Sequence, residues 1–236
     1  MTTPTPSGKE QEISQAIRRA EIQSKSNLEH FLEYFDTKVS LVTGRDQLEK
    51  VEELEAAIWS TNGFGSIDEY DKYKKCSSVF AAFLDEECLG FTRIFHGGEL
   101  YPPPFTTMDF FDSERKVETL TACSLGKIEE VGTLGVDHDS SEIPRGILSA
   151  NMWRLAYRDA VNREVDTWGI IMEPERVVEM NEKFSFKFVQ LGPESYYQGG
   201  MCAPFIMSLS EVAEAMEHQL PELYDWFVND EVVAAN

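Results

Sequence analysis

The sequence has no long apolar run and few basic residues. No stretch approaches the roughly 18 apolar residues that a membrane-spanning helix needs, so we expect no such helix. The 42 Asp and Glu residues outnumber the 21 Lys and Arg residues and give a formal net charge of −21. Because nucleic acids and anionic membranes bind through clustered basic side chains, this balance excludes a general binder of either kind. Solubility is the simpler explanation of the charge, and a cationic partner or substrate is the alternative.

Metal-binding and disulfide patterns are also missing. The four cysteines are Cys76, Cys88, Cys123 and Cys202; they form no CxxC pair, and the histidines lie far from them in sequence. His138 lies between two aspartates, but no second ligand is placed by spacing, so we expect no bound metal. Reduced thiols in a cytoplasmic protein are the expectation. Cys123 and Cys202 are alternative nucleophiles, although neither has a recognised local motif.

The chain length suits one domain with a sizeable core. The sequence has 236 residues, 42% of them hydrophobic. Residues 1–8 are polar, lack the apolar segment of a secretory signal and are expected to be a disordered lead-in. We predict a single domain over residues 1–236, with a helical extension at residues 9–38 and a C-terminal helical segment at residues 208–236.

Hydrophobic periodicity predicts alternating helices and strands. After the N-terminal helix, helices are expected at residues 46–59, 144–164 and 174–184, and strands at residues 39–42, 77–84, 88–95, 127–137, 165–172 and 186–191. The proline-rich residues 101–105 are expected to be irregular, because consecutive prolines cannot join a strand ladder. Ser208-Leu209-Ser210-Glu211 is a capping box that opens a C-terminal helix, and Pro221 restarts that helix. Alternation of this kind predicts an α/β sheet.

Several local motifs follow one another in order along the chain. Trp59 precedes an acidic loop with Asp68 and Asp71, and Arg93-Ile94 closes a strand. In chain order there follow a proline-bearing segment at 101–105 (YPPPF), a strand motif at 130–136 (EVGTLGV) that places Glu130 first, and an ending at 185–193 (SFKFVQLGP) with Tyr196 and Tyr197 just beyond. Together these motifs resemble the GNAT superfamily, and within it the branch of acyl-homoserine-lactone autoinducer synthases and N-acyl amino acid synthases.

This resemblance implies a fold and an activity. The fold is an α/β, GNAT-like mixed central sheet with splayed middle strands, flanked by helices and by extra N- and C-terminal helices. The activity is transfer of an acyl group, expected to be long-chain, from a phosphopantetheine thioester to the amine of an amino acid or similar small amine. No tightly bound cofactor is implied; acyl-phosphopantetheine on an acyl carrier protein, or acyl-CoA, is the donor. An acyl carrier protein is therefore a candidate partner, and the sequence does not indicate an oligomeric state.

The sequence departs from that branch at one motif. Where the family has Ser-Arg after the glutamate, this chain has Gly132-Thr133. This difference favours the amino-acid-acylating side over an autoinducer synthase that uses S-adenosylmethionine, which stays as an alternative. A catalytically silent GNAT-like domain that binds a partner or an acyl ligand is the other alternative.

The segment after that motif bears on the donor. Related acetyl-CoA enzymes hold a pyrophosphate with a glycine-rich turn at a helix start. Here the stretch 137–146 (DHDSSEIPRG) has three acidic side chains that would repel a pyrophosphate, a single glycine, and Arg145 as a partial offset. We therefore expect the donor to be held by its pantetheine arm. Acidic residues that simply stabilise a helix N-terminus are the alternative explanation.

Glu130 is the candidate general base. Regular alternation places it on one face with Ile128, Leu134 and Val136. A carboxyl among apolar neighbours has a raised pKa, which suits proton abstraction near neutral pH. Alternatively, a bulge turns Glu130 to solvent, or it pairs with Arg93.

Glu129 is expected to face the other way from Glu130, since the two are neighbours in a strand. Gly132 and Gly135 in the same strand predict a bulge or a close approach where the thioester arm lies, or else glycines kept for packing.

The remaining candidates follow from the resemblance. Asp68, Asp71 and Arg93 occupy substrate-side positions, and Arg93 either clamps a carboxylate or forms an ordinary salt bridge. Tyr197, or its neighbour Tyr196, either protonates the leaving thiolate or packs in the core. Phe105 opens the segment 105–111 (FTTMDFF), which is a candidate lining for an acyl tunnel.

The helix at residues 147–161 is apolar around much of its circumference and is expected to be buried against the sheet. Arg154 and Arg158 lie one turn apart on its remaining face. They form either a basic patch for an acidic carrier protein or local pairs with Asp159 and Glu164.

Overall fold

The computed structural model describes residues 38–62, 71–98, 102–137 and 145–228. The predicted N-terminal helix, Asp68, His138 and most of the acidic stretch 137–146 lie outside these ranges. Within them, no helix is long and apolar enough to cross a membrane.

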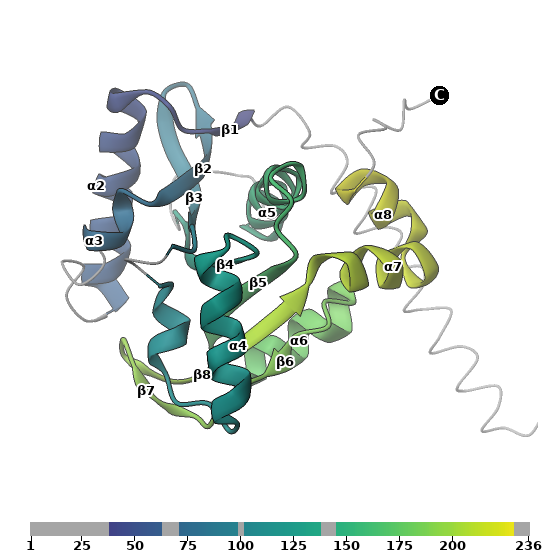
Figure 1. Ribbon diagram of the computed structural model, residues 1–236. Coiled ribbons are helices and arrows are strands. Elements are labelled where there is room, and N and C mark those ends of the chain that lie inside the picture. The colour runs from purple at the N-terminus through teal and green to yellow at the C-terminus, as the bar shows by residue number, and fades with distance from the viewer. Residues whose placement is uncertain (1–37, 63–70, 99–101, 138–144, 229–236) are drawn as a thin grey trace, which may run out of the picture. The chain divides into compact units, whose positions relative to one another are not determined.

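A mixed β-sheet forms the centre of the described chain (Figure 1). Its strand order is β1-β2-β3-β4-β5-β8-β6, and β7 pairs with β8. All neighbouring pairs are antiparallel except β4 and β5, which are parallel. The strands are β1 (Lys38–Leu41), β2 (Ser77–Leu84), β3 (Glu87–Phe95), β4 (Ile128–Val136), β5 (Thr167–Met172), β6 (Val189–Gln190), β7 (Ser195–Tyr197) and β8 (Gly200–Ser208).

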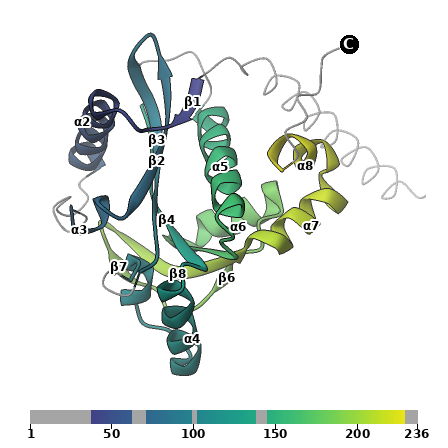
Figure 2. The same ribbon diagram turned by 45° about the horizontal axis from the view of Figure 1, so that its top comes forward.

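Helices cover both faces of this sheet. Helix α2 packs on β3 and β4 from one side, and α5 packs on β1 to β4 from the other, as Figure 2 shows. We call these sides the α2 face and the α5 face. The helices are α2 (Arg45–Asn62), α3 (Asp71–Lys74), the 3-10 turn η2 (Pro104–Thr107), α4 (Ser113–Ser124), α5 (Arg145–Asn162), α6 (Pro174–Phe184), α7 (Leu209–Gln219) and α8 (Pro221–Phe227).

Each face has its own apolar cluster. On the α2 face, Val51 of the helix packs with Val79 and Phe91 of the strands. On the α5 face, Leu148 and Met152 are fully buried, so the expected burial of this helix is confirmed. At about 25 cal/mol per Å² of apolar surface, burial of such side chains is the main term that holds the helices to the sheet.

Strands β4 and β5 pair only at their beginnings. The register joins Ile128 to Thr167, Glu129 to Trp168 and Glu130 to Gly169, and it ends there. From Val131 onward β4 pairs with β3 alone, and from Ile170 onward β5 pairs with β8 alone. The prediction that the two middle strands splay apart is therefore confirmed.

A β-bulge interrupts β4 at Gly132. Arg93 of β3 opposes Thr133, whereas the next residue, Ile94, opposes Val131, so that Gly132 is left over. A Cβ at this position would overlap the ring of Phe95. The expected bulge is therefore present, and it forms where only glycine fits.

The bulge overturns one prediction from regular alternation. Glu130 opposes Phe95 on the α2 face, but beyond the bulge Thr133 and Gly135 take up that face. Leu134 and Val136 therefore lie on the opposite face from Glu130, and Val136 packs with the α5-face cluster. The extra residue shifts the period-2 pattern by one place.

Some elements differ from the prediction because their sequence signals are weak. Helix α4 was not predicted; only Thr119 and Cys123 of it are buried, so it carries no apolar stripe. Strand β8 was not predicted, because it begins at a glycine and contains Pro204, a residue that argues against a central strand. The predicted strand at 186–191 shrinks to the two residues of β6.

The strand-to-helix junctions are otherwise close to prediction. Helix α6 has the predicted bounds, and Ser208 Oγ accepts a hydrogen bond from Glu211 N as the cap of α7. Pro221 opens α8. These starts are set by local chemistry that is visible in sequence.

Gly97 and Gly98, directly after β3, provide a matched test of packing between β3, α4 and β4. A Cβ on Gly97 would overlap Cys123 O and lie 2.6 Å from Ile128 O, whereas a Cβ on Gly98 would meet no atom of the described residues within 4 Å. We expect Gly97→Ala to lower the free energy of unfolding by about 1–3 kcal/mol, because the backbone must shift. Gly98→Ala should change it by less than about 0.5 kcal/mol. Urea unfolding measures both; equal effects would contradict the packing described.

Candidate active site

Glu130 lies at the point where β4 and β5 part. It opposes Phe95 of β3 on one side and Gly169 of β5 on the other, at the last paired position of the parallel ladder. Its side chain is 1% exposed, and its Oε2 accepts a hydrogen bond from the backbone N–H of Phe105 at 2.7 Å. The two alternatives, exposure to solvent and pairing with Arg93, are both excluded by this geometry.

Burial changes the acidity of this carboxyl. Removal from water raises the pKa of Glu130 from 4.5 to about 8, and the Phe105 N–H partly opposes the rise by stabilising the carboxylate. The carboxyl is therefore half-protonated near pH 8 and mostly protonated at neutral pH. A group of this acidity can accept a proton from an ammonium and return it to solvent.

Aromatic rings cover the two glycines next to Glu130. The ring of Phe95 lies over Gly132, and the ring of Phe105 lies over Gly169, where a Cβ would be 2.5 Å from Phe105 Cε1. Phe105 is fully buried and packs with a cluster that includes Cys123. These rings keep water from the carboxyl, which accounts for the desolvation.

Two predicted residues meet in an aromatic cluster on the same face. Trp59 of α2 packs with Tyr73 and Phe95, and Tyr197 lies partly buried against them. Because Phe95 opposes Glu130, the cluster adjoins the acid. Tyr196 points the other way and is 75% exposed.

Arg93 forms the salt bridge that was one of its two predicted roles. Its Nη2 lies 2.8 Å from Glu55 Oε2, and both side chains are 2% exposed. Glu55 also accepts from Thr133 Oγ1, so the pair ties α2 to β3 and β4. This contact holds the bulge in place. Because Glu55 neutralises its charge, the Arg93 guanidinium is less available to a ligand than that of an exposed arginine would be.

Glu129 faces away from Glu130, as expected, and belongs to a charged network on the α5 face. Arg163 binds both of its carboxylate oxygens, and His96 Nδ1 lies 2.5 Å from Oε1. His96 Nε2 in turn lies 2.9 Å from Ser78 Oγ. Burial alone would raise the pKa of Glu129, but the hydrogen bonds from His96 and Arg163 outweigh it and lower that pKa.

The other predicted residues are placed in part. Asp68 lies outside the described residues; Asp71 and Arg145 are the first residues of α3 and α5, and their side chains are not described. Gly135 lies beneath Phe91 and Ile58 Cδ1, at the contact of α2 with β4. Leu134 is 42% exposed.

The two cysteines considered as alternative nucleophiles, Cys123 and Cys202, have raised pKa values. Burial, and secondarily the nearby Glu130, raises the pKa of the Cys123 thiol to about 12. Burial also raises the pKa of Cys202. Both thiols are therefore protonated at physiological pH, and a thiol is a much weaker nucleophile than a thiolate.

Sequence reasoning missed three residues of the site. Phe95 and Gly169 flank Glu130, and Glu55 neutralises Arg93. Only Gly169, a glycine inside a predicted strand, carried a local signal. The others depend on contacts between distant segments.

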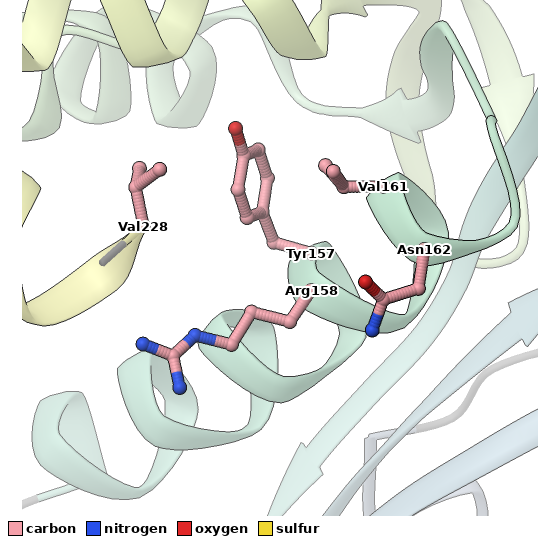
Figure 3. Close-up of a pocket in the computed structure, with 5 residues that line it drawn as sticks. All are labelled: Tyr157, Arg158, Val161, Asn162 and Val228. Carbon is pink, nitrogen blue, oxygen red and sulfur yellow. The ribbon is translucent and has the colours of Figure 1, made fainter. Parts of the chain in front are cut away.

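A hollow of about 250 Å³ lies elsewhere, between the end of α5 and the end of α8 (Figure 3). It is lined by Tyr157, Arg158, Val161, Asn162 and Val228. Its volume is below the roughly 300–1,000 Å³ of small-molecule sites. Of the residues singled out from the sequence, it contains only Arg158.

Arg154 and Arg158 bind the end of α8, a contact that the sequence did not predict. Arg154 Nε donates to Trp226 O at 2.6 Å, and Arg158 Nε donates to Phe227 O at 3.3 Å. The carbonyls at a helix C-terminus lack partners within the helix, so cations stabilise them. These contacts fasten α8 to α5.

Comparisons with known proteins agree with this geometry. No protein-family model and no curated protein matches the chain. Among solved structures, the fold is similar to FeeM, an N-acyl amino acid synthase from uncultured soil microbes, with a TM-score of 0.62 and 15% identity over 76% of this chain and 94% of that chain. It is also similar to the AHL synthase LasI, with a TM-score of 0.55 and 12% identity over 78% of this chain and 96% of that chain.

At these identities the similarity concerns the fold. The predicted GNAT-like sheet and the predicted resemblance to the branch that contains both kinds of synthase are confirmed at that level.

The buried ion pair gives a stability test. Glu55→Gln should lower the free energy of unfolding by about 3 kcal/mol, because it leaves the Arg93 charge buried without its partner. Glu55→Leu combined with Arg93→Met should recover most of that loss. Arg45 and Glu49 form an exposed pair, with side chains 89% and 58% exposed, so Arg45→Gln should cost less than about 0.5 kcal/mol. Urea unfolding distinguishes these cases, and a Glu55→Gln effect no larger than that of Arg45→Gln would refute the assignment.

Glu130 itself should lower stability at alkaline pH. Its pKa is about 8 when folded and 4.5 in the unfolded reference, so between these values the folded state binds the extra proton and stability falls as pH rises. Glu130→Gln, which has no charge to bury, should therefore be more stable than wild type by about 4–5 kcal/mol at pH 9. The advantage should vanish near pH 4. Urea unfolding at several pH values checks this; a difference independent of pH would show that Glu130 is not buried as described.

Proposed function

We propose that this chain is an N-acyltransferase that moves a long-chain acyl group from a phosphopantetheine thioester to the amine of an amino acid or a similar small amine. The observation that carries the proposal is the buried carboxyl of Glu130, whose pKa is raised to about 8, at the point where β4 and β5 separate. The fold shared with an N-acyl amino acid synthase and an AHL synthase supports the same reaction class.

The separation of the strands suits an extended thioester arm. Beyond Glu130, the edge of β4 that faces β5 is unpaired by that strand. Its backbone N–H and C=O groups are therefore available to the amides of a pantetheine arm and to the thioester carbonyl. A backbone N–H directed at that carbonyl stabilises the oxyanion that develops in the transition state.

Acyl transfer then needs three proton movements. Glu130 takes a proton from the acceptor's ammonium, which frees the nitrogen lone pair to attack the thioester carbonyl. The C–N bond forms, the C–S bond breaks, and the thiolate leaves. Tyr197, partly buried in the adjoining aromatic cluster, protonates that thiolate, since a neutral phenol is a hydrogen-bond donor. The nitrogen, which is cationic once the C–N bond has formed, gives its second proton to the tyrosinate, and Glu130 returns the first proton to solvent.

The acidic segment between β4 and α5 favours a carrier protein as donor. Asp137, Asp139 and Glu142 precede the start of α5, where they oppose a CoA pyrophosphate. The segment 105–111 is the proposed lining for the acyl chain, because Phe105 and Met108 are buried beside β5 and α4.

The test is product analysis by mass spectrometry. Purified protein is incubated with long-chain acyl carrier protein or acyl-CoA and a panel of amino acids, with S-adenosylmethionine as a separate acceptor. We expect an N-acyl amino acid, faster from the carrier protein, and a kcat lowered about 10²–10⁴-fold by Glu130→Gln. The rate should rise with pH through about 8, because only the carboxylate form is a base.

Glu87→Gln, an exposed carboxylate at the start of β3, is the matched control and should keep wild-type kcat. Absence of any acyl amide from folded wild type would refute the enzyme and favour a silent binding domain. An acyl-homoserine lactone would identify an autoinducer synthase. Unchanged product from Glu130→Gln would remove only the assignment of the base.

A further inference from the structure

We infer, resting on the proposed function, that Phe105 is the positioning residue of the base: its ring, packed against Gly169, holds its own backbone N–H on one oxygen of Glu130 and leaves the other oxygen to accept the substrate proton. Phe105 acts here through its backbone and its packing. This role differs from its predicted one as part of an acyl-chain lining.

The turn that contains Phe105 has one backbone N–H group, that of Phe105, that finds no acceptor within the turn. In η2 the N–H of Thr106 bonds to Pro103 O at 3.0 Å, and the N–H of Met108 bonds to Phe105 O. The N–H of Phe105 belongs to the first turn, where a helix supplies no acceptor. It is donated to Glu130 Oε2 instead, at 2.7 Å.

The turn is also stiff. Pro102, Pro103 and Pro104 precede Phe105, and each fixes its own φ angle. Thr106 Oγ1 donates to Pro103 O at 2.7 Å, and Thr107 Oγ1 donates to Pro104 O at 2.7 Å. A donor on such a turn loses little conformational entropy when it binds the carboxyl.

Gly169 allows the Phe105 ring to pack closely against β5. A Cβ at Gly169 would lie 2.5 Å from Phe105 Cε1 and 2.7 Å from Cδ1. Gly169 is also the register partner of Glu130. Ring, glycine and carboxyl therefore meet at one rung of the sheet, so a displacement of the ring moves the N–H away from the acid.

Few charged groups compete with this contact. On α4, Cys123 faces Glu130 as a protonated thiol. From β3 the opposing residue is Phe95, and the Arg93–Glu55 pair lies one side chain further along the same face. Glu129 points to the α5 face, where Arg163 and His96 bind it. Within the described ranges, the Phe105 N–H is the hydrogen-bond donor to Glu130.

The experiment compares wild type with Gly169→Ala, with the double variant Gly169→Ala/Phe105→Leu and with Gly98→Ala as a control. Two readouts are taken: the pH profile of kcat/KM for acyl amide formation, and the ¹H–¹⁵N shift of the Phe105 amide against pH. The second readout needs no substrate. In wild type the amide should titrate with the carboxyl, and in Glu130→Gln it should not.

Gly169→Ala should move the acid limb of the profile to higher pH by about one unit, because loss of a hydrogen bond to the carboxylate favours the protonated form. At pH 7 kcat/KM should fall about tenfold, and at high pH it should approach wild type. The smaller leucine in the double variant should restore most of the profile. Gly98→Ala should match wild type.

The outcomes separate this inference from the proposed function. If wild type forms acyl amide but Gly169→Ala lowers kcat/KM equally at every pH, or the wild-type Phe105 amide does not titrate with Glu130, the positioning role is overturned. If the amide titrates but no acyl amide forms, the proposed function fails instead. If Gly169→Ala does not fold, the wild-type and Glu130→Gln titrations still decide the contact.

Discussion

Three register pairs join β4 to β5, and the site depends on this ladder ending at the third pair, Glu130 with Gly169. With a longer ladder, β5 would cover the edge of β4 that follows Glu130. With a shorter ladder, Gly169 would no longer lie opposite Glu130, and the Phe105 ring would no longer pack against Gly169 beside the acid. Because parallel strands need evenly spaced, slanted hydrogen bonds, the bulge at Gly132, two residues after the last paired residue, is a physical reason for the ladder to stop.

Glu129 and Glu130 are neighbours with opposite electrostatic surroundings. Glu129 is compensated by Arg163 and His96, and it serves to hold β4 against the end of α5. Glu130 receives one backbone N–H and is otherwise enclosed by rings. Pairs of titratable groups whose environments drive their pKa values apart mark acid–base sites. In this chain the division follows from strand alternation, which sends adjacent side chains to opposite faces.

Sequence patterns predicted what local chemistry determines. The hairpin of β2 and β3, the bounds of α6, the cap at Ser208 and the bulge at Gly132 all rest on residues that are adjacent in the chain. Helix α4 was missed because it buries too few side chains to show an apolar stripe. Strand β8 was missed because it contains Pro204, a residue that is uncommon in central strands. In the site, Glu130 was predicted from its apolar neighbours, although Leu134 and Val136 proved to lie on the other face. Glu55 and Phe105 N–H could not be predicted as partners, because each contact joins residues that the fold alone brings together.

The left-over residue at Gly132 divides β4 into two half-strands that obey opposite face assignments. Because the bulge absorbs one residue, deletion of Gly132 would join the two halves in one regular pleat with Val131 still opposite Ile94 and Thr133 still opposite Arg93. Thr133 would keep its contact with Glu55, and Val136 would stay in the cluster under α5. A related strand without the bulge therefore aligns with this one through a one-residue gap at Gly132, and an ungapped alignment would superpose side chains from opposite sides of the sheet.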